Sequence, residues 1–389
     1  MQRTRFLIIG GGITGLAFAQ SLTLGDYAIC EALDDVGGYC RTIKRDGFVW
    51  DFSGHFFHFR HAELERELVQ RIGPEKVRRV VKDARIYYAG ELIDFPFQKN
   101  IHQLPREEFL QCLVDLFERE PGEPQNFEQM LYMKFGRSIA EKFLVPYQEK
   151  LYATALNRLD VGAMGRFFPH ADAEDIVRGF KKKPDGGYNA TFTYPEGGAY
   201  DYVLALKQGI PEERILLEEP VLELDLSRRV ARTSRREIGF EYVLSSLPFP
   251  RLLELCRLPF DASVYTQNKV LVFNLGFDAK GPQGIHWIYY PQRDLSFYRV
   301  GFYDNIFDTP RMSLYVELGY PSDAVLDAAT IDATRERVLA DLRTRTARTP
   351  KRTIRFEYLL SSAPFPRLLE AVGIPFERSV YSHNKVLVF

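Results

Sequence analysis

The feature that most constrains this chain is a short apolar run followed by closely spaced glycines near the N-terminus. The run Phe6–Ile9 precedes Gly10, Gly12 and Gly15, and an apolar stretch of helical character, Leu16–Leu24, comes after them. A G-x-G-x-x-G pattern between a strand and a helix is typical of the turn that opens a dinucleotide-binding α/β domain. The three glycines allow, in order, a tight turn, a close approach of a pyrophosphate, and close packing of the helix on the strand.

The next residues extend this pattern in the order that such a domain requires. A second apolar run, Tyr27–Cys30, ends in Glu31, about twenty residues after the glycines. A carboxylate at this point can accept hydrogen bonds from both hydroxyls of a ribose. A second pair of glycines, Gly37 and Gly38, and then Arg41 follow within ten residues. The ordered set predicts a nucleotide site at the N-terminus.

Composition excludes several other classes of protein. The 51 basic and 52 acidic side chains nearly cancel, so the chain has no overall field that favours a nucleic acid. No apolar run approaches the ~20 residues that a membrane-spanning helix requires, and the N-terminal glycines argue against a secretory signal. The four cysteines form no C-x-x-C pair, which fits a reducing compartment, and we expect a cytoplasmic protein.

Two further patterns have an ordinary and a functional interpretation. Aromatic residues make up 14% of the chain, enough to fill large cores or to line a deep pocket for a flat or sugar-bearing ligand. The histidines His55, His58 and His61 are spaced every third residue, but no carboxylate or cysteine lies at a convincing companion position. We therefore predict no metal site.

The middle of the chain contains four blocks that resemble one known family. A β-hairpin is expected over Arg85–Phe95 and mostly helical structure over Leu104–Phe180. In chain order the blocks are Phe95–Ile101, Pro146–Ala153, Tyr188–Pro195 and the segment from Trp287–Pro291 to Ser296–Arg299. Together they resemble the UDP-galactopyranose mutases, especially the eukaryotic-type branch. The glycine pair followed by Arg41 resembles the wider superfamily of FAD-binding amine oxidases and protoporphyrinogen oxidases.

The resemblance implies an α/β fold with a Rossmann-like FAD-binding domain, an inserted helical region and a mostly antiparallel substrate-domain sheet. The boundaries expected from it are 1–80 and 190–258 for the FAD-binding domain, 81–189 for the hairpin and helical insertion, 259–325 for the substrate sheet, and 326–389 for a charged helix and a repeated strand segment.

The resemblance also implies a reaction. The family interconverts UDP-galactopyranose and UDP-galactofuranose in glycan biosynthesis through an adduct between N5 of reduced FAD and the sugar. A nucleotide sugar is then the substrate, and NAD(P)H is a candidate electron donor; the oligomeric state is left open. A leaving diphosphate requires fixed cations, and arginine suits this role better than lysine.

Site residues follow by matching the family's motifs to positions in this sequence. The expected catalytic residues are His55, Arg166 and Arg299. Substrate contacts are expected from Arg166, Asn189, Tyr289, Tyr298 and Arg299. Cofactor contacts are expected from Gly10, Gly12, Thr14, Gly15, Glu31, Gly37, Gly38, Arg41, Gly54 and His55.

The C-terminal part departs from the family pattern. Residues 240–273 recur at 356–389, with 24 of 34 positions identical. The family's closing block, with a further diphosphate arginine and a helix N-terminus at the flavin, has no counterpart after Pro321. We expect impaired FAD binding or turnover if the repeat replaces that block, or a new role for the repeat if it is a true duplication. Two alternatives remain open, an amine or protoporphyrinogen oxidase-like oxidoreductase and a non-catalytic truncated or recombined flavoprotein.

Overall fold

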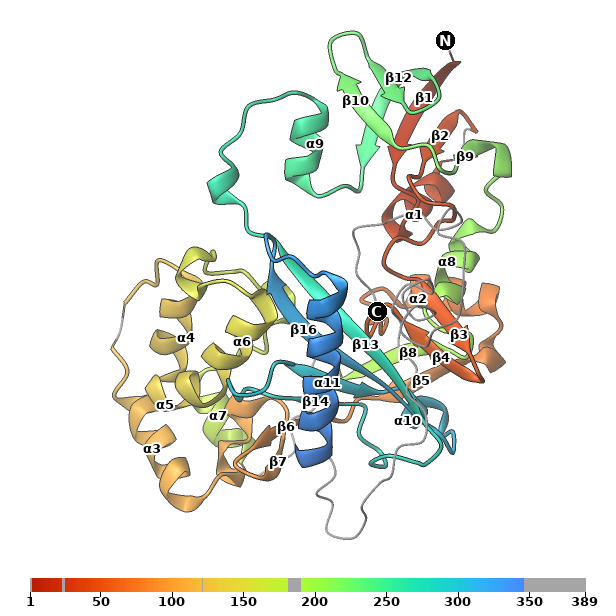
Figure 1. Ribbon diagram of the computed structural model, residues 1–389. Coiled ribbons are helices and arrows are strands. Elements are labelled where there is room, and N and C mark those ends of the chain that lie inside the picture. The colour runs from red at the N-terminus through yellow and green to blue at the C-terminus, as the bar shows by residue number, and fades with distance from the viewer. Residues whose placement is uncertain (1, 23–24, 121, 181–189, 346–389) are drawn as a thin grey trace. The chain divides into compact units, whose positions relative to one another are not determined.

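The computed structural model describes residues 2–22, 25–120, 122–180 and 190–345 (Figure 1). The chain forms two compact units. Unit 1 comprises residues 1–78 and 193–265, and unit 2 comprises residues 79–192 and 266–389. Because the chain leaves unit 1 and returns to it, residues far apart in the sequence build a single sheet there.

Unit 1 contains a six-stranded sheet in the order β10-β11-β12-β1-β2-β9. Strand β1 pairs in parallel with β12 on one side and with β2 on the other, whereas β10, β11 and β12 form an antiparallel meander. The strands are β1 (Gln2–Ile9), β2 (Tyr27–Cys30), β9 (Ile215–Leu216), β10 (Val221–Asp225), β11 (Val230–Thr233) and β12 (Glu237–Ser245).

Alternation along β1 places apolar side chains on both faces of this sheet. Ile8 packs in a cluster with residues of helices α1 (Ile13–Ser21) and α8 (Tyr200–Lys207). Leu7 and Ile9 face the opposite cluster, to which helix α9 (Phe249–Leu255) contributes Leu255. Both faces are therefore covered, as a sheet with a parallel centre requires. Unit 1 also contains the hairpin of β3 (Thr42–Arg45) and β4 (Phe48–Asp51) and helix α2 (Ala62–Ile72).

Unit 2 contains a second six-stranded sheet in the order β13-β16-β15-β14-β6-β7. All neighbouring pairs are antiparallel except β14 and β6. The strands are β6 (Ala84–Tyr88), β7 (Glu91–Asp94), β13 (Asn268–Phe277), β14 (Trp287–Tyr289), β15 (Arg299–Phe302) and β16 (Met312–Pro321). Two other strands, β5 (Val77–Val81) and β8 (Thr191–Pro195), pair with each other.

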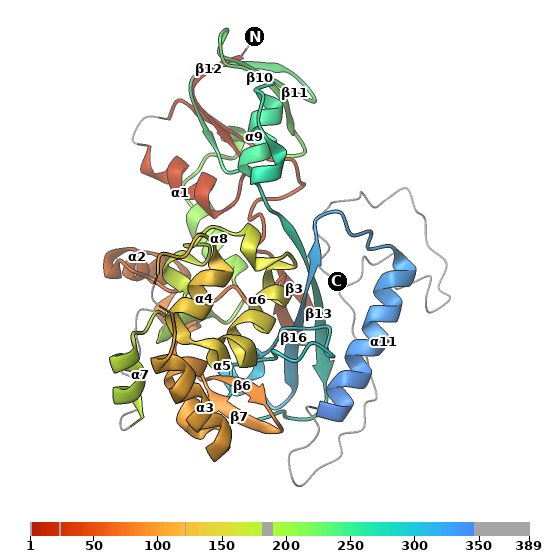
Figure 2. The same cartoon turned by 90° about the vertical axis from the view of Figure 1, so that its left-hand side faces the viewer.

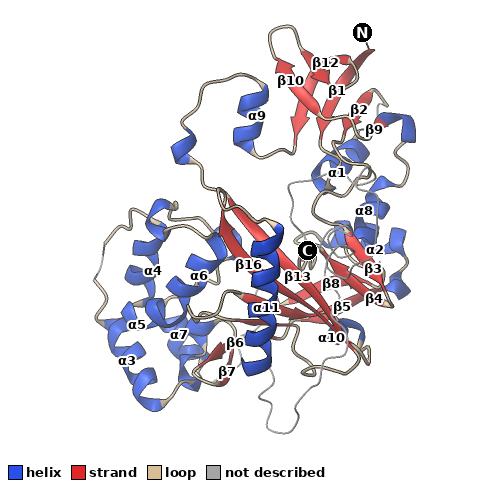
Figure 3. Cartoon of the chain, viewed as in Figure 1, coloured by secondary structure: helices blue, strands red, loops and turns tan. Residues whose placement is uncertain are grey.

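Most helices of unit 2 gather in one place, the helical insertion (Figure 3). The helical insertion holds α3 (Arg106–Phe117), α4 (Phe127–Phe135), α5 (Arg137–Ile139), a π-helical turn over Ala140–Leu144, α6 (Val145–Tyr152) and α7 (Ala173–Gly179); α10 (Asp304–Phe307) and α11 (Ala328–Arg345) lie in the C-terminal half. Figure 2 shows α11 along β13 and β16, and its Ile331 and Val338 share one apolar cluster with Leu271 and Val316 of those strands.

The other face of this sheet meets α6. A side chain in place of Gly319 on β16 would lie 2.1 Å from the carbonyl oxygen of Lys150, so the absence of a side chain allows strand and helix to approach. The Lys150 ammonium group donates to the carbonyls of Tyr290 and Gln292, at 2.7 and 3.0 Å. Residues of β16 that alternate with the α11-facing ones, such as Tyr315 and Glu317, therefore belong to the α6 side.

The expected fold class is confirmed, since the chain combines a Rossmann-like sheet with an inserted helical region and a mostly antiparallel second sheet. The expected strands before and after the glycines correspond to β1 and β2. The expected hairpin corresponds to β6 and β7, whose turn has positive φ at Ala89 and Gly90. Residues 346–389, which include the second copy of the repeat, lie outside the described residues. No helix among the described residues is long and apolar enough to cross a membrane.

Candidate functional site

The glycines of residues 10–15, which we call the glycine turn, have the geometry that the sequence predicts. Gly10 follows β1 with φ of +100°, a value that favours glycine, and its N–H donates to the carbonyl of Cys30 at 2.9 Å. A Cβ atom at Gly15 would lie only 2.0 Å from the Gly10 carbonyl oxygen. Helix α1 begins at Ile13 with no side-chain cap and no acidic residue in its first turn. Its N-terminal amides are therefore left for an external acceptor.

A second glycine loop, residues 34–41, lies directly against the glycine turn. The N–H of Gly37 donates to the carbonyl of Gly11 at 2.9 Å. Gly37 and Gly38 have φ of +117° and +56°. A Cβ atom built on Gly38 would lie 3.5 Å from the Cα atom of Gly12. The backbone of the second glycine loop thus faces the backbone of the glycine turn. Side chains at Gly12 or Gly38 would fill the space between the two segments.

Glu31 lies at the carboxyl end of β2 beside both glycine segments. The side chain is buried, and its Oε2 accepts a hydrogen bond from the N–H of Gly11 at 2.7 Å. Its Oε1 accepts from the N–H of Leu33 at 2.9 Å. These bonds fix the carboxylate next to the turn, and each oxygen keeps a further lone pair for a hydroxyl donor.

Arg41 closes the second glycine loop. Its Nη2 donates to the carbonyl of Asp35 at 2.6 Å, and its Nη1 lies 3.5 Å from a carboxylate oxygen of Asp34. Its Nε is buried and has no hydrogen-bond partner within the described part of the chain. Thr14 is exposed in the first turn of α1. The structure therefore gathers Gly10, Gly12, Thr14, Gly15, Glu31, Gly37, Gly38 and Arg41 in unit 1.

A buried carboxylate anchors this loop to helix α8. Asp51 is completely buried and accepts hydrogen bonds from Thr42 Oγ1 at 2.6 Å, Tyr194 OH at 2.8 Å and the Ala199 N–H at 3.0 Å. Burial raises the pKa of Asp51 to about 7, although the three hydrogen bonds act in the opposite direction. The Tyr200 N–H donates to Thr42 Oγ1 at 3.1 Å, which extends the network to the start of α8.

Gly54 and His55 follow β4 in unit 1 and are both half-buried. The His55 Nδ1 lies 2.9 Å from the carbonyl oxygen of Ser53, which fixes the plane of the imidazole. The described residues contain no group of three or more histidine, cysteine, aspartate or glutamate side chains placed to hold a metal ion.

In unit 2, Arg299 lies on β15 between two cross-strand neighbours, Tyr289 on β14 and Glu317 on β16. The guanidinium group donates from Nε and Nη2 to the two carboxylate oxygens of Glu317, at 2.6 and 2.7 Å. Glu317 is completely buried, whereas 23% of the Arg299 side chain is exposed. Burial acts against the charge of Arg299, but the Glu317 carboxylate holds the pKa of Arg299 well above its usual value.

Three buried tyrosines surround this ion pair, and we call the five residues the Arg299 cluster. The Tyr147 ring, from α6, lies edge-on to Tyr289 at 5.1 Å and to Tyr298 at 6.1 Å between ring centroids. Burial raises the pKa of all three hydroxyls, and the Glu317 carboxylate acts in the same direction on Tyr298. The hydroxyls therefore stay neutral and can donate or accept hydrogen bonds.

Arg166 lies in a short 3₁₀ helix, Gly165–Phe167, whose loop is held by two buried glutamines. The Nε2 of Gln98 donates to the Pro169 carbonyl at 2.5 Å, and the Nε2 of Gln148 lies 2.9 Å from the Met164 sulfur. The Oε1 atoms of both glutamines are buried without a hydrogen-bond partner in the described structure. The remaining predicted site residue, Asn189, lies outside the described residues.

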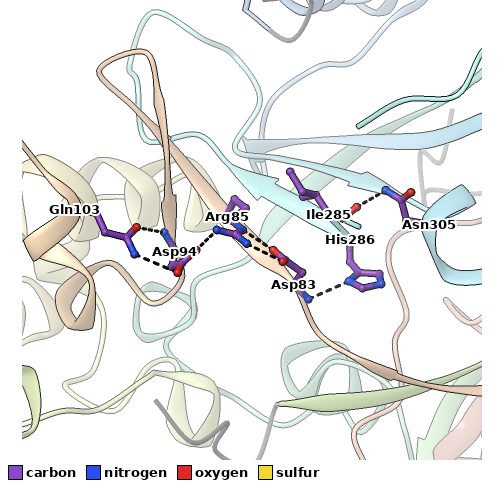
Figure 4. A network of polar contacts seen from close by, with 7 residues as sticks. All are labelled: Asp83, Arg85, Asp94, Gln103, Ile285, His286 and Asn305. Carbon is purple, nitrogen blue, oxygen red and sulfur yellow. Dashed lines mark hydrogen bonds and ion pairs between the residues drawn. The ribbon is translucent and has the colours of Figure 1, made fainter. Parts of the chain in front are cut away.

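A polar network fixes the hairpin that leads into the Phe95 block (Figure 4). Arg85 donates to Asp83 from Nε and Nη2, at 2.5 and 2.8 Å, and also pairs with Asp94. The Asp83 N–H donates to Nδ1 of His286 at 3.0 Å, and burial lowers the pKa of this histidine. Gln103 bonds to both the backbone and the side chain of Asp94. The network joins β6 and β7 to the segment before β14.

Glu317 was not among the residues predicted from sequence, although one signal points to it. It is the only charged residue within Met312–Pro321, a strand that is otherwise mostly apolar. A lone carboxylate in a buried strand requires a cationic partner. The sequence does not say which arginine pairs with it, because the partner is set by the register between β15 and β16.

Comparisons with known proteins point to flavoproteins. Curated sequence relatives include protoporphyrinogen oxidase 1 of Spinacia oleracea chloroplasts, 27% identical over 177 residues, which are 41% of this chain and 31% of the relative. The chloroplast protoporphyrinogen oxidase of Nicotiana tabacum is 26% identical over 172 residues, 40% of this chain and 30% of the relative. The matched region thus spans about a third of the length of these relatives.

Solved structures with the same fold include a reduced UDP-galactopyranose mutase, with a TM-score of 0.78 and 23% identity over 93% of this chain and 81% of the other. A protoporphyrinogen oxidase-like protein from Exiguobacterium sp. 255-15 has a TM-score of 0.69 and 20% identity, over 92% of this chain and 85% of the other. Residues 13–362 match the family described as flavin containing amine oxidoreductase, which is most of the chain. The chain therefore belongs to the flavin-containing amine oxidoreductase family, and FAD is its cofactor.

Proposed function

We propose that this protein is an FAD-dependent UDP-galactopyranose mutase-like enzyme that interconverts UDP-galactopyranose and UDP-galactofuranose. The observation that carries the proposal is the Arg299 cluster, in which a buried carboxylate holds an arginine in fixed orientation among three neutral tyrosines. A substrate whose diphosphate leaves and returns requires a cation that stays in place while the sugar reacts.

The residues of unit 1 fit FAD as a cofactor. The uncapped N-terminus of α1 and the cradle between Gly12 and Gly38 suit a pyrophosphate, which needs donors and close backbone approach. The Glu31 carboxylate suits the ribose hydroxyls, and the buried Nε of Arg41 supplies a further donor. When bound and reduced, the flavin would supply a nucleophilic nitrogen for the sugar. We assign Gly54 and His55 to its vicinity, with His55 as the residue that responds to the redox state of the flavin.

In unit 2, Arg299 would bind the diphosphate of the nucleotide sugar. Pairing with Glu317 uses its Nε–H and one N–H of Nη2, so three of the five N–H groups of the guanidinium are not used by that pair. The Tyr289 and Tyr298 hydroxyls would orient phosphate or sugar oxygens. Arg166 and Asn189 complete the proposed substrate contacts.

The proposal is tested by binding of UDP to the purified, FAD-loaded protein, measured by isothermal titration calorimetry in the oxidised and dithionite-reduced states. We expect tighter binding to the reduced protein and a loss of at least tenfold in affinity in Arg299→Ala. Arg293→Ala is the matched control, because Arg293 is 64% exposed and pairs with Glu149 at the surface. Equal affinity of the wild-type protein and Arg299→Ala would contradict the proposed role of Arg299.

One observation supports a different candidate function. The curated relatives matched by sequence include protoporphyrinogen oxidases, so an oxidase acting on a porphyrinogen or an amine is the alternative. An oxidase would consume oxygen in proportion to substrate and would not bind UDP. Oxygen-electrode measurements with protoporphyrinogen and with putrescine, alongside the calorimetry, separate the two functions.

A further inference from the structure

Lys82 lies in unit 2 just before β6 and places a positive charge against two aromatic rings. Its ammonium nitrogen is 5.2 Å from the centre of the Phe95 ring and 5.8 Å from that of the Trp287 ring. Its backbone N–H donates to the Ala190 carbonyl at 2.8 Å, which fixes the chain at this point. The Lys82 side chain is half-buried, so its charge is partly removed from water.

Within the described part of the chain, no carboxylate neutralises this ammonium group. The adjacent Asp83 is engaged elsewhere, because its two carboxylate oxygens accept from Arg85 at 2.5 and 2.8 Å (Figure 4). Burial lowers the pKa of Lys82 to about 8. A half-buried cation without an anion is unfavourable, and contacts with two aromatic rings offset only part of that cost.

The aromatic rings connect Lys82 with the Arg299 cluster. The Phe95 ring contacts both, since its centre is 5.2 Å from the Lys82 nitrogen and 5.0 Å from the centre of the Tyr289 ring. Trp287 and Tyr289 alternate on β14 and therefore point to the same face of the sheet. Arg299 is the cross-strand neighbour of Tyr289 and shares that face. Lys82 and Arg299 thus bring two cations to one face of the second sheet.

The two cations differ in the charge that they offer to a ligand. Glu317 accepts from Nε and Nη2 of Arg299, so this pair is neutral as a whole. The pair can direct N–H groups at a diphosphate, but it adds no net positive charge. Lys82 has no such partner among the described residues, so its charge remains available to an anion.

We propose that the Lys82 ammonium group binds a phosphate oxygen of the ligand held at the Arg299 cluster. The inference rests on the proposed function, because that function assigns a diphosphate to this face of the sheet. Bound phosphate would supply the anion that Lys82 lacks, and lysine binds phosphate as a point charge with three N–H donors. Phe95 and Trp287 would hold the ammonium group in place without neutralising it.

A purely structural role for Lys82 makes a different prediction. The methylene stem of a lysine can pack on aromatic rings while its charged group reaches water. Such a role depends on the stem, which Lys82→Met largely retains. The proposed role depends on the charge, which Lys82→Arg retains and Lys82→Met removes.

Isothermal titration calorimetry of the FAD-loaded, reduced protein tests the proposal with two probes, UDP and inorganic pyrophosphate. We expect Lys82→Met to weaken the binding of both at least tenfold, and Lys82→Arg to remain within about threefold of the wild type. Lys82→Gln is a second neutral variant, for use if Lys82→Met is poorly folded. The matched control is Lys134→Met. Lys134 is also half-buried over an aromatic ring, with 5.9 Å to the centre of Phe135, but it lies on α4, and its substitution should weaken neither probe.

The outcomes separate this inference from the proposed function. Unchanged UDP affinity in Lys82→Met would overturn the inference and leave the proposed function intact. Equal losses in Lys82→Met and Lys82→Arg would also overturn it, because they would assign Lys82 a structural role. Pyrophosphate binding that depends on Lys82, without any binding of UDP, would support the anion site and contradict the nucleotide-sugar function. Binding of neither probe by the wild-type protein would overturn both.

Discussion

The glycine turn of unit 1 and the Arg299 cluster of unit 2 are built in opposite ways. The turn is made of backbone: a Cβ atom at Gly10 would collide with the Ser246 hydroxyl, and one at Gly15 would collide with the Gly10 carbonyl oxygen. The cluster is made of side chains, with a completely buried carboxylate that holds one arginine. We therefore expect the glycine turn to be disrupted by substitutions that add a side chain. The Arg299 cluster should instead be disrupted by substitutions that remove a side chain.

The largest effect is expected from adding one side chain to the turn. In Gly15→Val the new Cβ atom would lie 2.0 Å from the Gly10 carbonyl oxygen, a backbone atom that cannot move without displacing β1 or α1. We expect a loss of about 4–5 kcal/mol in the free energy of unfolding and less than a tenth of the wild-type FAD content. Urea unfolding and the flavin absorbance of purified protein measure these two quantities.

Gly25→Ala is the control for this substitution, because a Cβ atom at Gly25 meets nothing within 4 Å. It should leave FAD content and stability almost unchanged. A Gly15→Val protein that retained stoichiometric FAD would contradict the geometry of the turn.

The second effect comes from removing the carboxylate in the cluster. Glu317→Ala leaves the Arg299 charge without its partner in a buried site, which we expect to cost about 3–5 kcal/mol. Glu149→Ala removes the partner of exposed Arg293 and should cost less than about 1 kcal/mol. Thermal or urea unfolding compares the two, and similar values would show that burial does not set the energetics of the Arg299 pair.

The third effect depends on pH and concerns the anchor of the second glycine loop. Because the pKa of Asp51 is raised in the folded state to about 7, the folded protein binds more protons at this site than the unfolded chain at pH values between about 4 and 7. The contribution of Asp51 to stability is thus fully present at low pH and is lost as pH rises to about 7.

The free energy of unfolding should therefore fall by up to about 1.4 kcal/mol per pH unit across this window, relative to Asp51→Asn. Urea unfolding of both proteins at pH 5, 6, 7 and 8 measures the difference. A difference that is constant with pH would mean that Asp51 is ionised throughout the range.

The smallest effect is expected from removing the Tyr200 hydroxyl, which lies beside the second glycine loop. Tyr200 donates its hydroxyl to Asp35 and packs its ring against Gly37. Tyr200→Phe keeps the ring and removes the hydrogen bond, which should cost about 1 kcal/mol of stability and only a few-fold in FAD affinity. A loss of FAD as complete as in Gly15→Val would show that side chains, and not backbone, dominate this site.

The glycine turn could be predicted from the sequence because its residues are close together along the chain, whereas the residues of the Arg299 cluster are not. The glycine turn is local, since Gly10 to Gly15 and Glu31 lie within about twenty residues, and the strand, turn and helix appeared where the spacing predicts them. The same is true of the hairpin β6–β7, whose turn residues determine its register. The nucleotide-binding strand, turn and helix therefore followed from short-range patterns, whereas FAD and the rest of the fold class were expected from resemblance to known flavoproteins.

The Arg299 cluster is not local. Arg299, Glu317 and Tyr289 meet because three antiparallel strands align them side by side, and Tyr147 comes from a helix in a separate segment. Resemblance to a family singled out Arg299, Tyr289 and Tyr298, but no spacing rule connects Glu317 with Arg299. Asp51 was missed for a similar reason, because Tyr194 and Ala199, more than 140 residues away, create its environment.

The most direct test of the proposed activity follows the sugar itself. FAD-loaded protein is reduced with dithionite and incubated with UDP-galactofuranose, and proton NMR or anion-exchange chromatography detects UDP-galactopyranose. We expect conversion by the reduced wild-type protein and a loss of at least a hundredfold in kcat/KM in Arg299→Ala. Absence of conversion by protein that visibly carries reduced FAD, together with oxygen consumption on an amine or porphyrinogen, would contradict it.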